Sequence, residues 1–379
     1  MAFTLDALRL AGDTPGTIVE LPVYRVGPDS ADRKVYLQAA LHADEQPGTM
    51  VLHHLLPMLR KADEQNLLRA RFVLVPMANP LGMANFVHRT HLGRYDLTTG
   101  VNYNRQWPDL FAAVGAEVAD RLGDDAQANT RAIRDAVAGW IAEQQPRSAT
   151  QQLRMLLLRE AHDADVVLDL HCDSDSLNYI YTSPEFMPGL QDLADWMGAA
   201  AVMTAADSGG GSFDEVLPLL YRKVAGANPG KPVPMASATA TLEYRGQNDV
   251  FDQLGEQDAL RLFGFLCGRG LVDADPGPVP SRSCEATPFE ATEIIRAGSA
   301  GIVAYRAELG QRVTKGEPIA DLIAVDGPEA FIGRTPIVAG TDGLLLTRSL
   351  RKYVTRGENI AKIVGTTPLP QRRGYLLED

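Results

Sequence analysis

Apolar runs and amphipathic stretches alternate along the first 270 residues. Residues 35–41, 71–77 and 165–170 are apolar on both faces, which is typical of central strands in a sheet that helices cover on both sides. Further strands are predicted at residues 17–26, 178–182, 200–203 and 237–244. The strands alternate with helical patterns, and this order predicts an α/β domain with a mixed or mostly parallel sheet.

The helical patterns lie at residues 48–65, 188–198 and 257–268, and helical patterns also dominate residues 110–160. Within residues 48–65, Pro57 is expected to kink or break the helix, because proline has no N–H to donate. Residues 81–109 show little periodicity and are rich in Gly, Asn, Thr, His and Arg. A long irregular stretch inside a compact domain is more often functional than idle. The glycines at 209–211 are interpreted as a flexible loop.

The sequence pattern changes after residue 272, from alternating strands and helices to a proline-rich segment followed by short strands. The segment 273–288 holds four prolines, Pro276, Pro278, Pro280 and Pro288, and marks a linker. Beyond it, the nine residues from Arg312 repeat as the nine residues from Tyr353, each as strand, Gly-Glu turn, strand. We expect three parts: a catalytic domain at 1–272, a linker at 273–287 and a small all-β barrel or sandwich at 288–379.

This paired repeat resembles the biotinyl/lipoyl-carrier domains over about residues 288–365. Residues 331–346, between the two copies, contain no lysine that could carry a prosthetic group. The C-terminal unit is therefore expected to be structural and to shape access to an active site.

Composition and charge exclude several partners. The net charge is −12, which disfavours nucleic acid as a partner. No apolar run reaches the ~18 residues of a membrane helix, and the N-terminal residues do not have the pattern of a signal peptide. The three cysteines are few and widely spaced, as is typical of reduced thiols, so we expect a cytoplasmic protein.

Candidate metal ligands follow two of the buried strands. His42 lies just after the run 35–41, Glu45 follows three residues later, and His171 ends the run 165–170. Open α/β sheets place their sites beyond the carboxyl ends of strands. Two imidazoles and one carboxylate are a catalytic zinc set that leaves one position open. Glu243, near the end of another strand, could serve as general base or as an ordinary acid paired with Arg245.

Arginines in the irregular stretch suit an anionic substrate. Arg94 and Arg105 could provide one guanidinium for a substrate carboxylate and another for a developing oxyanion, and Asn104 beside Arg105 could add a hydrogen bond. By composition alone, both would be interpreted as surface arginines.

These motifs together resemble the succinylglutamate desuccinylase/aspartoacylase family, a branch of the zinc carboxypeptidase superfamily. The resemblance covers about residues 35–250 and rests on an ordered set of motifs: His42-x-x-Glu45, Asn79-Pro80, Arg94-Tyr95-Asp96, Asn102-x-Asn104-Arg105, Asp169-Leu-His171 and Thr241-Leu-Glu243. It implies a zinc-carboxypeptidase-like mixed β-sheet covered by helices, with a β-rich C-terminal domain.

The resemblance also implies roles for these residues and one Zn²⁺ per chain. His42, Glu45 and His171 match the metal ligands, Glu243 matches the general base, and Arg94 is similar to the oxyanion arginine. Asn104 and Arg105 match the substrate-carboxylate clamp. The expected activity is hydrolysis of the amide bond of a small N-acyl amino acid or related N-acylated metabolite. A metallocarboxypeptidase acting on peptides and a catalytically silent metal-binding module are the alternatives.

Some features depart from the family pattern. Residues 109–159 look like an inserted helical region that could form a lid or the contact of a homo-oligomer. His88 and His91 have no family role, and pocket or structural use is expected for them ahead of metal binding. Asp169 shares a strand face with His171 and could support it from behind.

Overall fold

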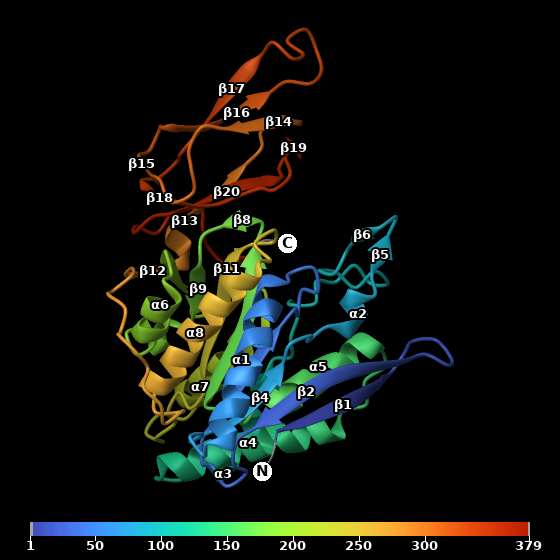
Figure 1. Cartoon of the computed structure of the whole chain (residues 1–379), viewed down its shortest axis with the longest axis vertical. Coiled ribbons are helices and arrows are strands. Elements are labelled where there is room, and N and C mark those ends of the chain that lie inside the picture. Colours follow the sequence, from blue (N-terminus) through green and yellow to red (C-terminus); the bar gives the residue numbers. More distant parts are fainter. Residues whose placement is uncertain (1–2, 378–379) are drawn as a thin grey trace.

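A nine-stranded mixed sheet runs through the larger unit of the computed structural model, which describes residues 3–377 (Figure 1). Its central strands β4, β3, β7 and β11 are parallel. The antiparallel hairpin β1–β2 extends one side, and β9, antiparallel to β11, begins the other. The order across the sheet is β1 (Thr4–Ala11), β2 (Ile18–Val26), β4 (Arg71–Val75), β3 (Lys34–Ala39), β7 (Val166–Asp173), β11 (Ala238–Gly246), β9 (Tyr179–Thr182), β10 (Ala201–Thr204) and β12 (Ala286–Pro288).

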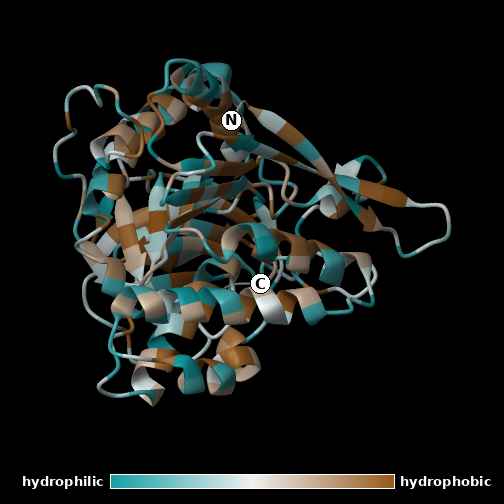
Figure 2. Ribbon diagram, turned by 90° about the horizontal axis from the view of Figure 1, so that it is seen from below, coloured by the Kyte–Doolittle hydropathy of each residue, from teal (hydrophilic) through white to brown (hydrophobic). Residues whose placement is uncertain are grey.

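Helices cover both faces of this sheet, so the predicted α/β architecture is confirmed. One face packs against α1 (Pro47–Glu64), α6 (Gln191–Met197) and α8 (Asp252–Gly268). The other packs against α3 (Leu110–Arg121), α4 (Ala126–Glu143), α5 (Ala149–Ala161) and α7 (Val216–Ala227). In Figure 2 apolar residues mark the central strands, and the helices carry both apolar and polar residues. The helices within 109–159 thus bury residues such as Val114, Ile133 and Leu157 against the sheet.

The expected break at Pro57 is wrong, because α1 continues through it. Pro57 and His53, one turn earlier, both lie on the exposed side of the helix. The carbonyl group that loses its N–H partner at this proline therefore faces water, which can hydrogen-bond it. The apolar stripe of Val51, Leu55 and Leu59 stays buried and holds the helix on the sheet.

The C-terminal unit is a sandwich of two small sheets around its own apolar cluster. One sheet has the order β13 (Thr292–Arg296), β20 (Asn359–Val364), β18 (Gly343–Arg348), β15 (Arg312–Val313). The other has the order β17 (Arg334–Val338), β16 (Pro318–Ile323), β14 (Gly301–Tyr305), β19 (Tyr353–Val354).

The sequence repeat in this unit forms the same turn twice. In the first copy the backbone N–H of Thr314 donates to Glu317 Oε2 at 2.9 Å, and in the second Thr355 donates to Glu358 Oε2 at the same distance. The glycine between them has a φ of 89° in one copy and 86° in the other, a left-handed conformation that glycine adopts without strain.

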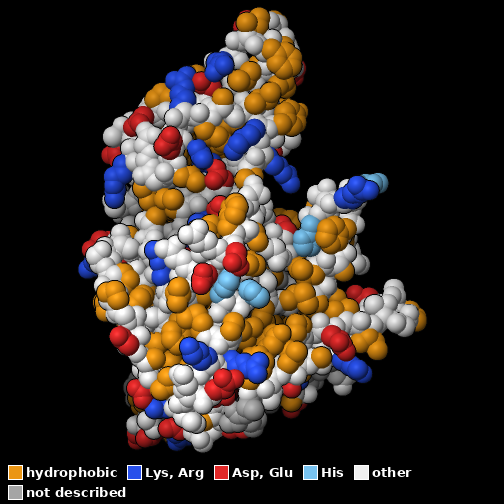
Figure 3. Space-filling model, in the orientation of Figure 1, with side chains coloured by type: hydrophobic (Ala, Val, Ile, Leu, Met, Phe, Trp, Pro, Cys, Tyr) orange, Lys and Arg blue, Asp and Glu red, His pale blue; other side chains and the backbone are white. Residues whose placement is uncertain are grey.

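The two units are joined by a strand pair and an apolar cluster. The short strand β8 (Asp175–Ser176) pairs with β18 of the sandwich. Tyr179 and Met203 of the large sheet pack with Leu346 and Val364 of the sandwich and with Leu376 near the end of the described chain. Figure 3 shows the sandwich above the larger unit, with a notch between it and the projecting hairpin β5 (Phe86–Val87) and β6 (Thr90–His91). The boundaries expected at 272/273 and 287/288 stay predictions.

Short helical segments complete the described chain. They are α2 (Pro80–Met83) and the 3₁₀ turns η1 (Pro184–Phe186), η2 (Phe213–Glu215) and η3 (Phe289–Ala291). Among residues 3–377, no helix combines the length and the apolarity that a membrane crossing requires.

Candidate metal centre and active site

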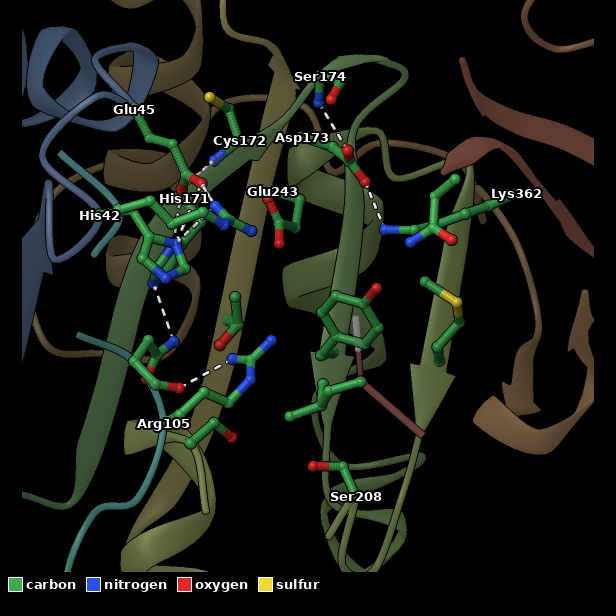
Figure 4. A pocket seen from close by; sticks show the side chains of 18 of the residues that line it. His42, Glu45, Arg105, His171, Cys172, Asp173, Ser174, Ser208, Glu243 and Lys362 are labelled. Atoms are coloured by element: carbon green, nitrogen blue, oxygen red, sulfur yellow. Dashed lines mark hydrogen bonds and ion pairs between the residues drawn. The ribbon is translucent and has the colours of Figure 1, made fainter. Parts of the chain in front are cut away.

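His42, Glu45 and His171 meet at one edge of the large sheet (Figure 4). One donor atom from each lies within 4.8 Å of the other two, and all three residues are buried. His42 and Glu45 occupy the turn between β3 and α1, where Glu45 N–H donates to His42 C=O at 3.0 Å. Gly48 lets α1 approach β7, because a Cβ there would lie only 2.7 Å from Leu170 Cβ. The sequence prediction that three distant residues converge here agrees with this geometry.

The hydrogen bonds of the two imidazoles fix which nitrogen faces the centre. Nδ1 of His42 lies 3.1 Å from Glu45 Oε1, and Nδ1 of His171 lies 2.8 Å from Glu45 Oε2. On the far sides, His42 Nε2 contacts Asn102 Oδ1 at 2.7 Å and His171 Nε2 lies 3.0 Å from Asp169 Oδ2. The Asn102 oxygen at His42 Nε2 favours protonation there and leaves the Nδ1 lone pair of His42 for a metal, and the Asp169 carboxylate lies beside His171 Nε2 in the same way.

The pKa shifts prepare His42 and Glu45 for a cation, whereas His171 must give up a proton when a metal binds. Burial, and then the nearby Arg94 guanidinium, lower the pKa of His42 to about 4, so this imidazole is neutral at pH 7. Burial works against a charged His171, but the carboxylates of Asp169 and Glu45 raise its pKa well above the usual range. Burial alone would raise the pKa of Glu45, yet the neighbouring cationic groups lower it, so it is a carboxylate. Two imidazoles and a carboxylate in this arrangement fit a zinc ion.

Glu243 lies beside this centre, from β11. Its backbone is in register with His171 on the parallel neighbour β7. In Figure 4 its carboxylate lies between the imidazoles on one side and Lys362 on the other. Its Oε2 has no hydrogen-bond partner among the described residues. Burial, followed by the charge of Glu45, raises the pKa of Glu243 to about 8, which is near the value that suits a general base at neutral pH.

The irregular loop at residues 94–107 brings Arg94, Asn104 and Arg105 to the same cavity. Arg94 Nη1 lies 2.5 Å from Glu45 Oε1 and 3.1 Å from His42 Nδ1. The guanidinium therefore lies directly beside any cation that these residues hold. Asn104 Oδ1 accepts the Phe213 N–H at 2.8 Å, so this amide also supports the neighbouring glycine loop.

The cavity around these residues has a volume of about 620 Å³ and is lined by both units. The larger unit supplies the candidate metal ligands, Glu243, Arg94 and Arg105. The sandwich supplies Arg296, residues 349–351 and residues 357–359, together with Lys362. Lys362 Nζ lies 2.6 Å from Asp173 Oδ2. The sandwich therefore forms one wall of the cavity.

The glycine loop is an ordered part of this site. Gln106 N–H donates to Gly210 C=O at 3.0 Å, and Trp107 N–H donates to Gly211 C=O at 2.9 Å. Leu376 N–H, from the end of the described chain, donates to Ser208 C=O at 2.8 Å. Residues 209–211 form a loop, as the sequence predicts, and the carbonyl groups of Gly210 and Gly211 pair with backbone N–H groups of another loop about 100 residues away.

His88 and His91 lie away from the metal candidates, on the β5–β6 hairpin. His88 is exposed at its turn, with a φ of 47°. His91 stacks on Phe86 and its Nε2 contacts Gly82 C=O at 3.0 Å. Within the described residues, the only group of three or more metal-binding side chains is that of His42, Glu45 and His171.

Comparisons with known proteins agree with this geometry. Residues 31–215 match the family model described as the succinylglutamate desuccinylase/aspartoacylase catalytic domain. A family protein of the same description from Shewanella amazonensis SB2B has a structure that matches with a TM-score of 0.82 at 25% identity, over 95% of this chain and 98% of that chain. Residues 31–215 therefore form a catalytic domain of the succinylglutamate desuccinylase/aspartoacylase type. The match to this family of hydrolases supports a hydrolase function.

Two other structures show the same fold. One, from Shewanella frigidimarina NCIMB 400 and of the same family description, matches with a TM-score of 0.82 at 23% identity, over 96% of this chain and 97% of that chain. The ectoine utilization protein EutE (DoeB) from Ruegeria pomeroyi matches with a TM-score of 0.67 at 15% identity, over 97% of this chain and 96% of that chain. A search of curated protein sequences finds no match. The sandwich is thus part of a fold shared along almost the full length of these relatives.

Three residues near the site show what the sequence did and did not indicate. The spacing on a strand left Asp169 open as a support of His171 or a plain structural acid, and its Oδ2 lies 3.0 Å from His171 Nε2. Asn102 was quoted only as part of a motif, although its Oδ1 holds His42 Nε2. Lys362 was missed, because no local pattern connects a strand of the sandwich with the cavity.

Proposed function

We propose that the chain is a zinc-dependent deacylase that hydrolyses the amide bond of a small N-acyl amino acid or a related N-acylated metabolite. The observation that carries the proposal is the convergence of His42, Glu45 and His171 beside Glu243 in one cavity. The match of residues 31–215 to the catalytic domain of desuccinylases and aspartoacylases supports the reaction class.

Each residue has a distinct task in this reaction. Zinc, when held by His42, Glu45 and His171, supplies a Lewis acid that lowers the pKa of water. Glu243 accepts a proton from the attacking water and then donates it to the departing nitrogen. Arg94 stabilises the negative charge on the carbonyl oxygen, because its guanidinium lies next to the metal ligands.

Arg105 binds a carboxylate of the substrate and so fixes the amide in register. It lines the same cavity as Glu243, and Figure 4 shows both within one view of the pocket. Its Nη1 donates to Asn104 C=O at 2.8 Å, which orients the guanidinium.

The wall formed by the sandwich favours small substrates over peptides. Residues 349–351 and 357–359 lie across the cavity from the metal candidates and would meet a long chain. A cavity of about 620 Å³ is in the range of small-molecule sites, roughly 300–1,000 Å³.

A substrate panel tests the proposal. Zinc-loaded protein is assayed with N-acetyl and N-succinyl amino acids, including N-acetylaspartate and N-succinylglutamate, beside short peptides with a free C-terminus. We expect amine release from at least one small N-acyl amino acid and about one zinc per chain. Release of C-terminal residues from peptides without turnover of any small amide would favour the carboxypeptidase alternative and reject the proposal.

A further inference from the structure

Arg154 lies on α5, outside the motifs of the metal centre, yet its side chain contacts residues 102–107, which we call the substrate loop because they include Asn104 and Arg105. Its Nη2 donates to Arg105 C=O at 2.8 Å and lies 3.5 Å from Asn102 C=O. Its Nη1 donates to Gln106 C=O at 3.3 Å. The guanidinium also lies over the Trp107 ring, 5.7 Å from its centroid. One side chain thus contacts four of the six residues from 102 to 107.

The loop needs such support, because its backbone is irregular. Gln106 has a φ of 57°, a left-handed conformation that a residue with a Cβ adopts only when its surroundings hold it. Its N–H bonds to the glycine loop on one side, and its C=O to Arg154 on the other. The same helix also holds the start of the loop, where Thr150 Oγ1 donates to Asp96 Oδ2 at 2.7 Å.

The partners of Arg154 are unusual for a guanidinium that is largely removed from water. Within residues 3–377 it forms no ion pair with a carboxylate, and its hydrogen bonds go to backbone carbonyl groups. Burial lowers its pKa, which reflects the cost of removing this charge from water. A partly buried cation without an ion pair adds little stability, so the position of Arg154 is better explained by the loop that it orders.

We propose that Arg154 is a positioning residue that orders the 102–107 loop and thereby sets Arg105 for the substrate carboxylate. The inference rests on the proposed function, because it assigns Arg105 the task of carboxylate binding. It also gives the helical segment 109–159 a role, because α5 in this segment holds the substrate loop in place.

The test compares a carboxylate substrate with its carboxamide counterpart. The best N-acyl amino acid of the panel and the same compound with the clamped carboxylate converted to a carboxamide are assayed with wild type, R154M and R154K. Methionine keeps the apolar stem over Trp107 but makes no hydrogen bonds to the loop. In R154M we expect kcat/KM for the carboxylate to fall about 10- to 100-fold, mainly through KM, as a small misplacement of a positioning group can do.

The carboxamide should show little change, because it does not use the charge of Arg105. R154K should be intermediate, since one ammonium group cannot span carbonyl groups that a planar guanidinium bridges. R159M is the matched control on the same helix: Arg159 is about half exposed and pairs with its neighbour Glu160, and its kinetics should equal wild type. Metal content and circular dichroism identify folded variants, and R154K carries the test if R154M does not fold.

R105M separates this inference from the proposed function. If R105M removes the preference for the carboxylate while R154M and R154K keep it, the positioning role is overturned and the proposed function stands. If wild type turns over both substrates equally, the assignment of Arg105 fails and the positioning role fails with it. An equal loss on both substrates in R154M would also overturn the positioning role, because it would indicate a general disturbance of the site.

Discussion

Replacement of Glu243 by Gln is the sharpest test of the proposed chemistry. The change keeps the shape of the side chain and removes its ability to accept a proton. Glu243 lies opposite His171 on the neighbouring strand, and its Oε2 has no partner among the described residues. Because the side chain holds no other group in place through this oxygen, the substitution should leave the fold and the metal ligands intact.

The expected loss of rate in E243Q follows from the role of Glu243 as general base. Loss of a general base typically reduces the rate about 10²- to 10⁴-fold, and a 10³-fold loss corresponds to about 4 kcal/mol of transition-state free energy. We expect the loss in kcat and in kcat/KM, with about one zinc per chain retained in E243Q.

The pH profile adds an independent readout. The pKa of Glu243 is raised to about 8, first by burial and then by the charge of Glu45. A protonated carboxyl group cannot accept a proton from water, so wild-type kcat/KM should fall as the pH falls through this pKa. A bound dication favours the carboxylate and moves the midpoint below about 8. E243Q should lack this acidic limb.

The assay measures amine release over a pH series, with metal content determined on the same samples. E256Q, on the exposed side of α8, is the control and should behave as wild type. Turnover of E243Q near the wild-type rate, or an acidic limb that survives in E243Q, would refute the assignment of Glu243 as general base.

Three further changes test the support of the site. In D169N the acceptor beside His171 Nε2 stays but its charge is lost, so we expect zinc affinity, measured against a chelating dye, to fall about 10- to 100-fold; unchanged affinity would contradict this supporting role. In G48A the new Cβ would lie 2.7 Å from Leu170 Cβ, so α1 must move, and the free energy of unfolding in guanidinium chloride should fall by about 1–3 kcal/mol. K362M leaves the buried carboxylate of its ion pair without a cation, and unfolding should become easier by about 1–3 kcal/mol.

Matched controls accompany the two stability predictions. Gly139 on α4 has open space around its Cβ position, so G139A should be neutral or stabilising by up to about 1 kcal/mol. Lys315 is exposed in a turn of the sandwich, and K315M should change the unfolding free energy by less than about 0.5 kcal/mol. Losses in the controls equal to those in G48A and K362M would show that packing and pairing at these two positions are not the cause.

The sequence predicts those parts of the site in which chemistry and strand ends coincide. His42 and His171 each close an apolar run, and apolar runs of this kind form the central strands β3 and β7. Parallel strands end at the same edge of a sheet, so the two imidazoles were expected together. The same reasoning explains Glu243, whose strand β11 lies next to β7.

The parts that could not be predicted depend on contacts without a local pattern. Arg154 recognises backbone carbonyl groups, which every residue carries, so no motif marks its target. The glycines at 209–211 look featureless because their partners are also backbone groups. Pro57 was misjudged because its cost depends on which side of the helix faces water, and that side is set by packing against the sheet.

The pairing of β8 with β18 limits how far the sandwich can move relative to the cavity. Thr347 and Arg348 of the sandwich lie in register with Ser176 and Asp175, only a few residues beyond the candidate metal ligand His171. This strand pair fastens the sandwich to the larger unit close to the proposed reaction centre. The sandwich therefore cannot rotate away from the cavity without breaking backbone hydrogen bonds. A sandwich held in this way keeps the space between the two units nearly constant, so the fixed size of the cavity would limit which amides fit.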